Sequence, residues 1–175
     1  RHLNLASNRL TDESINKIVN EITSPDSPMQ LLSLDLSNND IDEITALALA
    51  KFLHSKHCVL TSLALEQADL DDYETAAFFE SLQYNNTITS LNFSNNVIGG
   101  VREILHKTAP MIDPQTHKPI QTGGSAIASA LLINRTLTYL DLSWNQFGEE
   151  SGRLFGTMLA NNKTLTHLNL GYNGL

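Results

Sequence analysis

The sequence has one cysteine, few aromatic residues, no long apolar run and fewer basic than acidic residues. Its single cysteine, Cys58, excludes an internal disulfide and favours a reducing compartment, so we expect a cytoplasmic protein. No stretch approaches the ~18 apolar residues of a membrane-spanning helix. The 11 Lys and Arg against 19 Asp and Glu give a net charge of −8, which disfavours nucleic acid and anionic membranes as partners.

The sequence contains one motif of eleven residues that recurs along the chain. "LTYLDLSWNQF" (137–147) returns as "LTHLNLGYNGL" (165–175), and "LLSLDLSNNDI" and "ITSLNFSNNVI" stand earlier. The shared frame is Leu-x-x-Leu-x-Leu-x-x-Asn-x-Leu. Successive frame positions for Asn are spaced by 31, 29, 28, 49 and 28 residues. Such a period predicts a repeat architecture. The frame positions are Asn8, Asn39, Ala68, Asn96, Asn145 and Asn173.

Each unit combines a short strand with a helix. Leu-x-Leu has the period of a strand with its leucines turned inward, near residues 3–5, 34–36, 63–65, 91–93, 140–142 and 168–170. Apolar pairs spaced by four residues predict the inward stripe of a helix in the second half of each unit. These pairs are Ile18/Ile22, Leu49/Leu53, Phe78/Leu82, Ile127/Leu131 and Phe155/Leu159. Stacked units bury this apolar surface, so we expect an open, right-handed α/β solenoid with a parallel sheet.

Three segments carry a family resemblance: "NNTITSLNFSNN", "NRTLTYLDLSWN" and "NKTLTHLNLGYN". With the unit of about 28 residues, they resemble the ribonuclease-inhibitor-like class of leucine-rich repeat proteins. The resemblance implies an open horseshoe with a concave parallel β-sheet and convex helices. It does not imply one activity, because relatives include inhibitors, immune receptors, activators of small GTPases, cytoskeletal proteins and bacterial effectors.

The whole chain, 1–175, reads as a single repeat array. We expect it to be a fragment of a longer chain, because neither end carries the polar capping unit that seals a solenoid core. The spacing of 49 residues between Asn96 and Asn145 predicts an insertion at about 100–121, where three of the five prolines indicate an irregular loop. A shorter insertion lies near residues 24–29.

The frame asparagines predict a structural ladder. We expect Asn8, Asn39, Asn96, Asn145 and Asn173 to satisfy backbone groups in the bend after each strand. Ala68 interrupts this ladder, so a water or a local backbone shift should replace its bonds. Acidic residues at the predicted helix starts suit helix caps and dipoles, and Asp71 with Glu74 predicts a capping pair.

The outward residues of the strands define a concave face that is mostly small and polar, and Trp144 and Tyr172 are expected on this strand surface. Trp144 and Tyr172 are the exception, and they occupy the same column in consecutive units. Exposed aromatic residues are common interface anchors, although mutual packing also explains the pair. Acidic and amide side chains nearby offer a complementary field for a basic partner, and the insertion adds lysines. The candidate partner-binding residues are Trp144, Tyr172, Asp141, Glu66, Asp35, Asn92, Lys107 and Lys118.

Catalytic, cofactor and metal motifs are absent from the sequence, so we expect no enzyme and no cofactor. His106, Asp113 and His117 in the insertion, and His54, His57 and Cys58 at a helix end, lack a metal-ligand spacing. Three of four Asn-x-Ser/Thr sequons come from the repeat phrase itself, where Asn suits a turn. We therefore do not expect glycosylation.

The expected function is a protein-binding scaffold that uses its concave face and the inserted loop, within a larger protein or assembly. A GTPase-activating module of the same repeat class is an alternative, and a bacterial effector with such a binding domain is another. On stability, we expect Leu142→Ala to cost roughly 2–5 kcal/mol. Ser143 lies one position away and is expected to face solvent, so Ser143→Ala should change stability by less than about 0.5 kcal/mol.

Overall fold

The computed structural model describes residues 1–24, 26–27, 29–99 and 121–175. Within these residues, strands and helices alternate along the chain. Their bounds are β1 (His2–Asn4), α1 (Asp12–Thr23), β2 (Ser33–Asp35), α2 (Glu43–His54), β3 (Ser62–Ala64), α3 (Asp72–Leu82), β4 (Ser90–Asn92), α5 (Gly123–Ile133), β5 (Tyr139–Asp141), α6 (Glu149–Asn161) and β6 (His167–Asn169).

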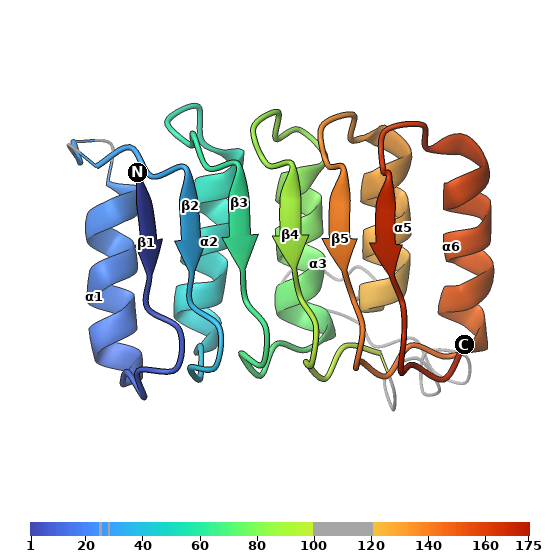
Figure 1. The fold of residues 1–175 in the computed structure, drawn as a ribbon, viewed down its shortest axis with the longest axis horizontal. Helices are drawn as coiled ribbons and strands as arrows, with labels where there is room; N and C mark the ends of the chain where they lie inside the picture. Colours follow the sequence, from blue (N-terminus) through green and yellow to red (C-terminus); the bar gives the residue numbers. More distant parts are fainter. Residues whose placement is uncertain (25, 28, 100–120) are drawn as a thin grey trace.

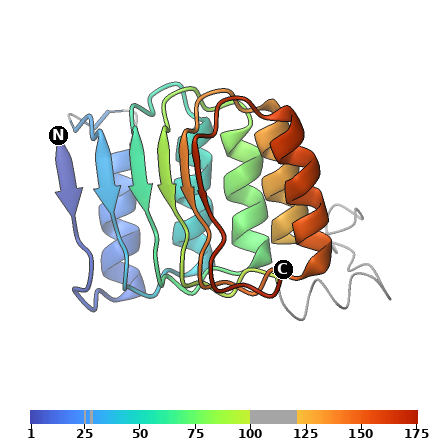
Figure 2. The same ribbon diagram turned by 45° about the vertical axis from the view of Figure 1, so that its right-hand side comes forward.

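The six strands form one parallel sheet in sequential order, β1-β2-β3-β4-β5-β6. The register pairs each central leucine with the next, so that Leu34 faces Leu63 and Leu91 faces Leu140. The helices of the described residues cover one face of this sheet and leave the other face open (Figures 1 and 2). The structure confirms the predicted α/β repeat solenoid with an open parallel sheet. Each strand begins and ends one residue earlier than predicted, which is within the usual uncertainty of element ends.

The core lies between the sheet and the helices. Leu36, Leu65, Phe93 and Leu142, which directly follow the strands, are fully buried at 0% exposure. Phe93 contacts Phe78 and Phe79 edge-on, with ring centroids 5.1 and 5.9 Å apart. Such aromatic pairs add to the stabilisation from apolar burial. The predicted leucine columns are therefore the continuous core of the stacked units.

Two predicted helix positions are wrong at the ends of the array. Leu159 is 46% exposed, and Met158 beside it is buried. Ile18 is half-buried, whereas Ile15 and Val19 are buried in its place. The inner helices are covered on both flanks by neighbouring helices. Helices α1 and α6 each contact one described helix, so in this structure their outer apolar residues lack the second flank that buries those of the inner helices.

Acidic residues cap two of the described helices, α2 through Asp42 and α3 through Asp71. Helices α1 and α5 are capped by Thr11 and Thr122 instead. The Asp42 carboxylate accepts a hydrogen bond from the Thr45 N–H at 2.8 Å. Helix α3 has a complete capping box, in which the Asp71 N–H donates to the Glu74 carboxylate at 3.0 Å. Burial, with a hydrogen bond between the Glu74 and Asp71 side chains, raises the pKa of Glu74 to about 7. Among the described residues, no helix has the length and apolarity needed to cross a membrane.

Candidate functional site

The turn that follows each strand has the same unusual backbone in all six units. The residue before each frame position has a positive φ, between 50° and 58°. In the first five units its backbone N–H donates to the next unit, as from Asn95 to the Ser143 carbonyl at 2.8 Å and from Trp144 to the Gly171 carbonyl at 2.9 Å. These left-handed residues therefore form a column at the end of the strands. The column consists of Ser7, Asn38, Gln67, Asn95, Trp144 and Tyr172.

Trp144 and Tyr172 stand in this turn and not on a strand, because β5 ends at Asp141 and β6 ends at Asn169. This corrects the prediction that placed them on the strand surface. Their rings stack with centroids 3.9 Å apart and planes 13° from parallel, and the residues are 56% and 71% exposed. The shared column of the two units thus creates an exposed aromatic stack.

The acidic and amide candidates on the strands hold the same turns in place. Asp141 accepts hydrogen bonds from the Ser143 N–H and hydroxyl at 2.9 and 2.6 Å. Its other oxygen accepts from the Asn169 amide at 3.0 Å. Asp35 is bonded in the same manner to the Ser37 N–H and the Asn4 amide. The donors that position both carboxylates are neutral, and no ion pair to either is found within the described residues.

The frame asparagines bond the backbones of neighbouring units. The Asn145 amide donates to the carbonyls of Phe93, Leu142 and Ser143 at 2.9–3.3 Å, and the Ile98 N–H donates to its oxygen at 3.3 Å. Asn39, Asn96 and Asn173 make the corresponding three donations. Asn8 differs, since its amide donates to the Ala6 carbonyl, within its own unit.

The third unit has alanine at the frame position and at the last strand position, and other groups in the unit accept the hydrogen bonds that Asn or Asp accepts elsewhere. At Ala68, the Ile41 N–H donates to the backbone carbonyl of Ala68 at 3.4 Å in place of a side-chain oxygen. At Ala64, the strand lacks an Asp or Asn side chain. Glu66 supplies the missing acceptor, because its carboxylate accepts a hydrogen bond from the Asn92 amide at 3.2 Å. Glu66 therefore continues the row of side-chain bonds between units.

A second pair of rings lies at the start of the same two strands. Tyr139 and His167 are paired in the β5–β6 register, with ring centroids 6.1 Å apart. Both are exposed, and the preceding strands carry Ser33, Ser62 and Ser90 at this position. Sequence reasoning missed this pair. A comparison of the residues six before each frame position would have found it.

The prediction that Ser143 faces solvent is wrong, because Ser143 is 6% exposed. Ser37 and Ser94 at the same position are also buried. The cause is the left-handed turn that begins directly after the strand and folds these serines against the Asx side chain two residues before.

We now expect Ser143→Ala to destabilise the fold by about 1 kcal/mol, because the hydroxyl bond to a carboxylate is lost while the Ser143 N–H bond remains. Ser90→Ala is the matched control. Ser90 is half-buried on β4 and makes no side-chain hydrogen bond within the described part of the chain, so its loss should stay within ~0.5 kcal/mol. Urea unfolding of both variants measures the difference, and equal losses would contradict the role of the hydroxyl.

Lys107 and Lys118, and nearly all of the predicted insertion at 100–121, lie outside the described residues. The two backbone positions that flank it are described. One oxygen of Asp72, at the start of α3, accepts hydrogen bonds from the Gly99 N–H and the Gly123 N–H, both at 2.8 Å. Gly99 has a φ of +93°, and a side chain on Gly123 would collide with Ile98 and Asp72. Asp72 is 1% exposed, so a buried carboxylate joins both flanks of the insertion.

The base of the insertion adjoins the turn that carries Trp144. Gly99 forms a parallel bridge with Gln146, and the Gln146 N–H donates to the Ile98 carbonyl at 2.9 Å. Gln146 follows Trp144 by two residues. The N-terminal flank of the insertion therefore pairs with the backbone that directly follows the Trp144 turn.

The sequons of the repeat phrase form a second asparagine ladder, on the side where helices lead into strands. The Asn134 amide donates to the carbonyls of Leu82 and Asn85 at 2.7 and 3.1 Å, and Asn134 is 2% exposed. Asn85 and Asn162 donate likewise to Leu53 and Leu131. A glycan on these nitrogens is incompatible with these bonds, so the repeat itself explains the sequons.

No group of three or more His, Cys, Asp or Glu side chains with metal-site geometry occurs in the described parts of the chain. Cys58 is buried, with its sulfur 3.8 Å from the Thr87 hydroxyl. The candidate set His106, Asp113 and His117 falls outside the described residues.

Two sequence models of one family match this chain. The first, described as "Leucine Rich repeat", matches residues 1–19, 84–101, 134–156 and 161–175. The second, described as "Leucine Rich Repeat", matches residues 30–52, and together they cover more than half of the chain. No curated protein matches it.

One solved structure shows the same fold. The structure titled "Leiomodin-1 Actin-Binding Site 2 (ABS2)" has a TM-score of 0.64 and 24% identity, over 89% of this chain and 78% of that one. An internalin (inlF) from Listeria monocytogenes covers 82% of this chain and 55% of its own, at 14% identity and a TM-score of 0.22. The first likeness supports the fold alone, and the second is too weak to support an argument. With these matches and its six-strand repeat sheet, the chain belongs to the leucine-rich repeat proteins, a fold that generally serves protein interaction rather than catalysis.

Proposed function

We propose that this chain is a non-enzymatic protein-binding scaffold in the cytoplasm, and that its partner contacts the open face of the sheet around Trp144 and Tyr172. The observation that carries the proposal is the exposed stack of these two rings. Large aromatic residues on a rigid surface are the commonest anchors of protein interfaces.

The energetics of the turn favour this proposal over simple packing. A left-handed backbone costs most L-residues roughly 1–2 kcal/mol each, whereas Asn, which occupies the column at Asn38 and Asn95, tolerates it better. One aromatic pair returns about 0.5–1.5 kcal/mol. The stacking contribution alone is therefore smaller than the backbone cost of two such positions. Gln67 holds the same backbone without a ring, so the turn itself does not require an aromatic residue, and this supports a role in binding for the two rings.

The remaining candidates surround this anchor. Asp141 is the last residue of β5, three residues before Trp144. Asp35, Glu66 and Asn92 continue the polar row across the earlier units. The insertion, with Lys107 and Lys118, is proposed to hold the partner from the side. Support for this comes from its base, where Gly99 pairs with Gln146 beside the Trp144 turn.

Actin is a sensible first partner to test, because the structural neighbour is titled as an actin-binding site. The low identity makes this a starting point for a screen. Co-sedimentation with filaments and binding to monomers measure it directly, and an affinity pull-down identifies other partners without assuming their identity.

For an identified partner, we expect Trp144→Asn and Tyr172→Asn each to weaken binding about thirtyfold. This corresponds to the roughly 2 kcal/mol that truncation of a buried aromatic anchor costs. Asn is chosen because it occupies the same left-handed position at Asn38 and Asn95, so the fold is preserved. Calorimetric titration gives the affinities, and urea unfolding confirms that the variants are folded.

The matched control is Tyr84→Asn. Tyr84 is also a strongly exposed aromatic residue, at 68%, but it follows α3 and packs against His54. It should bind like the parent chain. A partner that binds both column variants with parental affinity, or that is lost with Tyr84→Asn, would place the interface elsewhere. Deletion of residues 100–120 tests the role of the insertion separately.

A further inference from the structure

Four rings gather on the open side of the last two strands. Tyr139 and His167 lie at the start of β5 and β6, and Trp144 and Tyr172 follow their ends. Asp141 and Asn169 pair between them in the register. We call these six residues the β5–β6 aromatic patch. The equivalent positions on β2, β3 and β4 carry Ser, Asn and Gln in place of rings, so the patch distinguishes one end of the sheet from the rest.

The charge of this face has one sign from the second unit onward. The segments 32–38, 61–67, 89–95, 138–144 and 166–172 contain the carboxylates Asp35, Glu66 and Asp141 and no Lys or Arg. Within the described residues, the hydrogen bonds to these carboxylates come from neutral serine, asparagine and backbone groups. The face is therefore electrostatically complementary to a cationic segment.

Aromatic rings beside a carboxylate select among cations. A guanidinium group stacks on an aromatic face while its in-plane N–H groups point toward a carboxylate, and the Asp141 oxygen that Asn169 bonds can accept one more hydrogen bond. An ammonium group is a compact point charge that is more strongly hydrated and lacks the planar stack. Trp is the best ring for such contacts, and Trp144 has the face opposite Tyr172 free of ring stacking within the described residues.

We propose that the β5–β6 aromatic patch binds an arginine-bearing segment of a protein partner, with the guanidinium stacked on the Trp144–Tyr172 pair and its charge balanced by Asp141. The inference rests on the proposed scaffold function and adds the chemistry of the partner. A proline-rich segment and a second copy of this chain are the competing occupants, and the experiment separates them.

The probe is a set of fluorescein-labelled peptides with the same alternating glycine background. One peptide carries arginine, one lysine, one proline and one citrulline, which is the neutral isostere of arginine. Fluorescence anisotropy at about 0.15 M salt, where exposed long-range charge effects are screened, gives each affinity. We expect the arginine peptide to bind at least tenfold tighter than the citrulline peptide, with lysine between them.

Substitutions in the chain locate the binding. Asp141→Asn should weaken the arginine peptide about tenfold, and Trp144→Asn should weaken it by at least as much. The double exchange Asp141→Asn with Asn169→Asp retains the net charge and the donor–acceptor pair between the strands. It should recover most of the affinity lost by Asp141→Asn alone.

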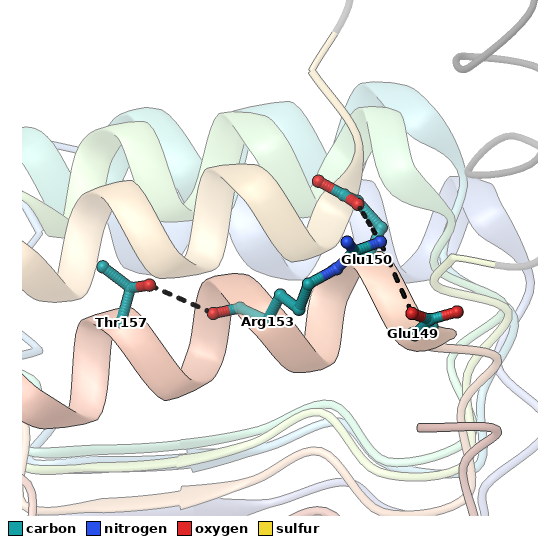
Figure 3. A network of polar contacts seen from close by, with 4 residues as sticks. All are labelled: Glu149, Glu150, Arg153 and Thr157. Carbon is teal, nitrogen blue, oxygen red and sulfur yellow. Dashed lines mark hydrogen bonds and ion pairs between the residues drawn. The ribbon is translucent and has the colours of Figure 1, made fainter.

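Glu149→Gln is the charge-matched control. Glu149 lies at the start of α6, with its carboxylate 3.6 Å from Arg153, and Arg153 is also paired with Glu150 at 3.0 Å (Figure 3). The substitution removes one negative charge away from the sheet face. Affinity for the arginine peptide should change by less than about twofold, since exposed charges far from a ligand are screened.

Each unfavourable outcome has a definite meaning. Equal binding of arginine and citrulline peptides, tighter binding of the proline peptide, or equal effects of Asp141→Asn and Glu149→Gln would overturn arginine recognition. So would self-association of the chain that depends on Trp144. The scaffold proposal would survive these results as long as Trp144→Asn and Tyr172→Asn still weaken the natural partner, so the two failures are distinguishable.

Discussion

Asp72→Ala is expected to lower the free energy of unfolding by about 2–4 kcal/mol. The substitution removes the acceptor of two buried backbone donors, the N–H groups of Gly99 and Gly123. A buried donor that loses its partner costs roughly 1–3 kcal/mol. Removal of a carboxylate that is itself buried returns part of that cost, which keeps the expected loss below the sum.

Glu43→Ala is the control at the equivalent position. Glu43 is the first residue of α2, as Asp72 is the first residue of α3, but Glu43 is exposed. Its loss should stay within ~0.5 kcal/mol, the usual range for a surface site. Urea unfolding of the two variants provides the comparison. Losses of similar size would mean that Asp72 acts as an ordinary helix-start carboxylate and not as the clamp of the insertion.

Leu142→Ala is expected to cost roughly 2–5 kcal/mol, as other buried leucine truncations do. Leu142 is 0% exposed between the sheet and the helices, and the rigid stack of units limits collapse around the cavity. Its carbonyl also accepts hydrogen bonds from the Asn145 and Asn173 amides, so local shifts would strain the ladder.

The control for Leu142→Ala is Leu132→Ala on helix α5. Leu132 is 39% exposed, so its truncation leaves little cavity and should cost less than about 1 kcal/mol. Denaturant melts of the two variants test the direction of the strand leucines. A comparable loss in both would contradict the assignment of Leu142 to the core.

The leucine columns and the parallel sheet could be predicted because their signals are local and periodic. Leu-x-Leu alternates with the period of a strand, and every unit repeats it. Leu34, Leu63, Leu91 and Leu140 consequently lie in one row at 0–1% exposure. The signal for a helix start is equally local, since the Asp71–Glu74 capping pair lies within one turn.

The left-handed column could not be predicted from residue type. Its six members include Ser, Asn, Gln, Trp and Tyr, and neither Trp nor Tyr indicates a positive φ. Without that turn, Ser143 appeared to continue the strand and to face solvent. Its burial follows from the tertiary bend directly after Asp141.

The hydrogen bonds that Asp72 accepts from both flanks of the insertion could not be predicted, for a different reason. Its partners Gly99 and Gly123 lie 27 and 51 residues away in the sequence, and an acidic residue at a helix start already had a local explanation. The Tyr139–His167 pair could have been predicted, because the repeat frame alone places these two residues opposite each other in neighbouring strands. The register of the strands could be predicted from the repeat, whereas the backbone conformation of the turn and the long-range bonds of Asp72 could not.

The central claim, that a partner binds over the Trp144–Tyr172 stack, is tested most directly by a fluorine label on Trp144. It is the single tryptophan of the chain, so 5-fluorotryptophan gives one ¹⁹F resonance from the proposed anchor even when the partner has tryptophans of its own. We predict that saturating partner shifts and broadens this resonance and removes its response to added solvent paramagnet. An unchanged resonance, under conditions where calorimetry shows the complex fully formed, would contradict the account.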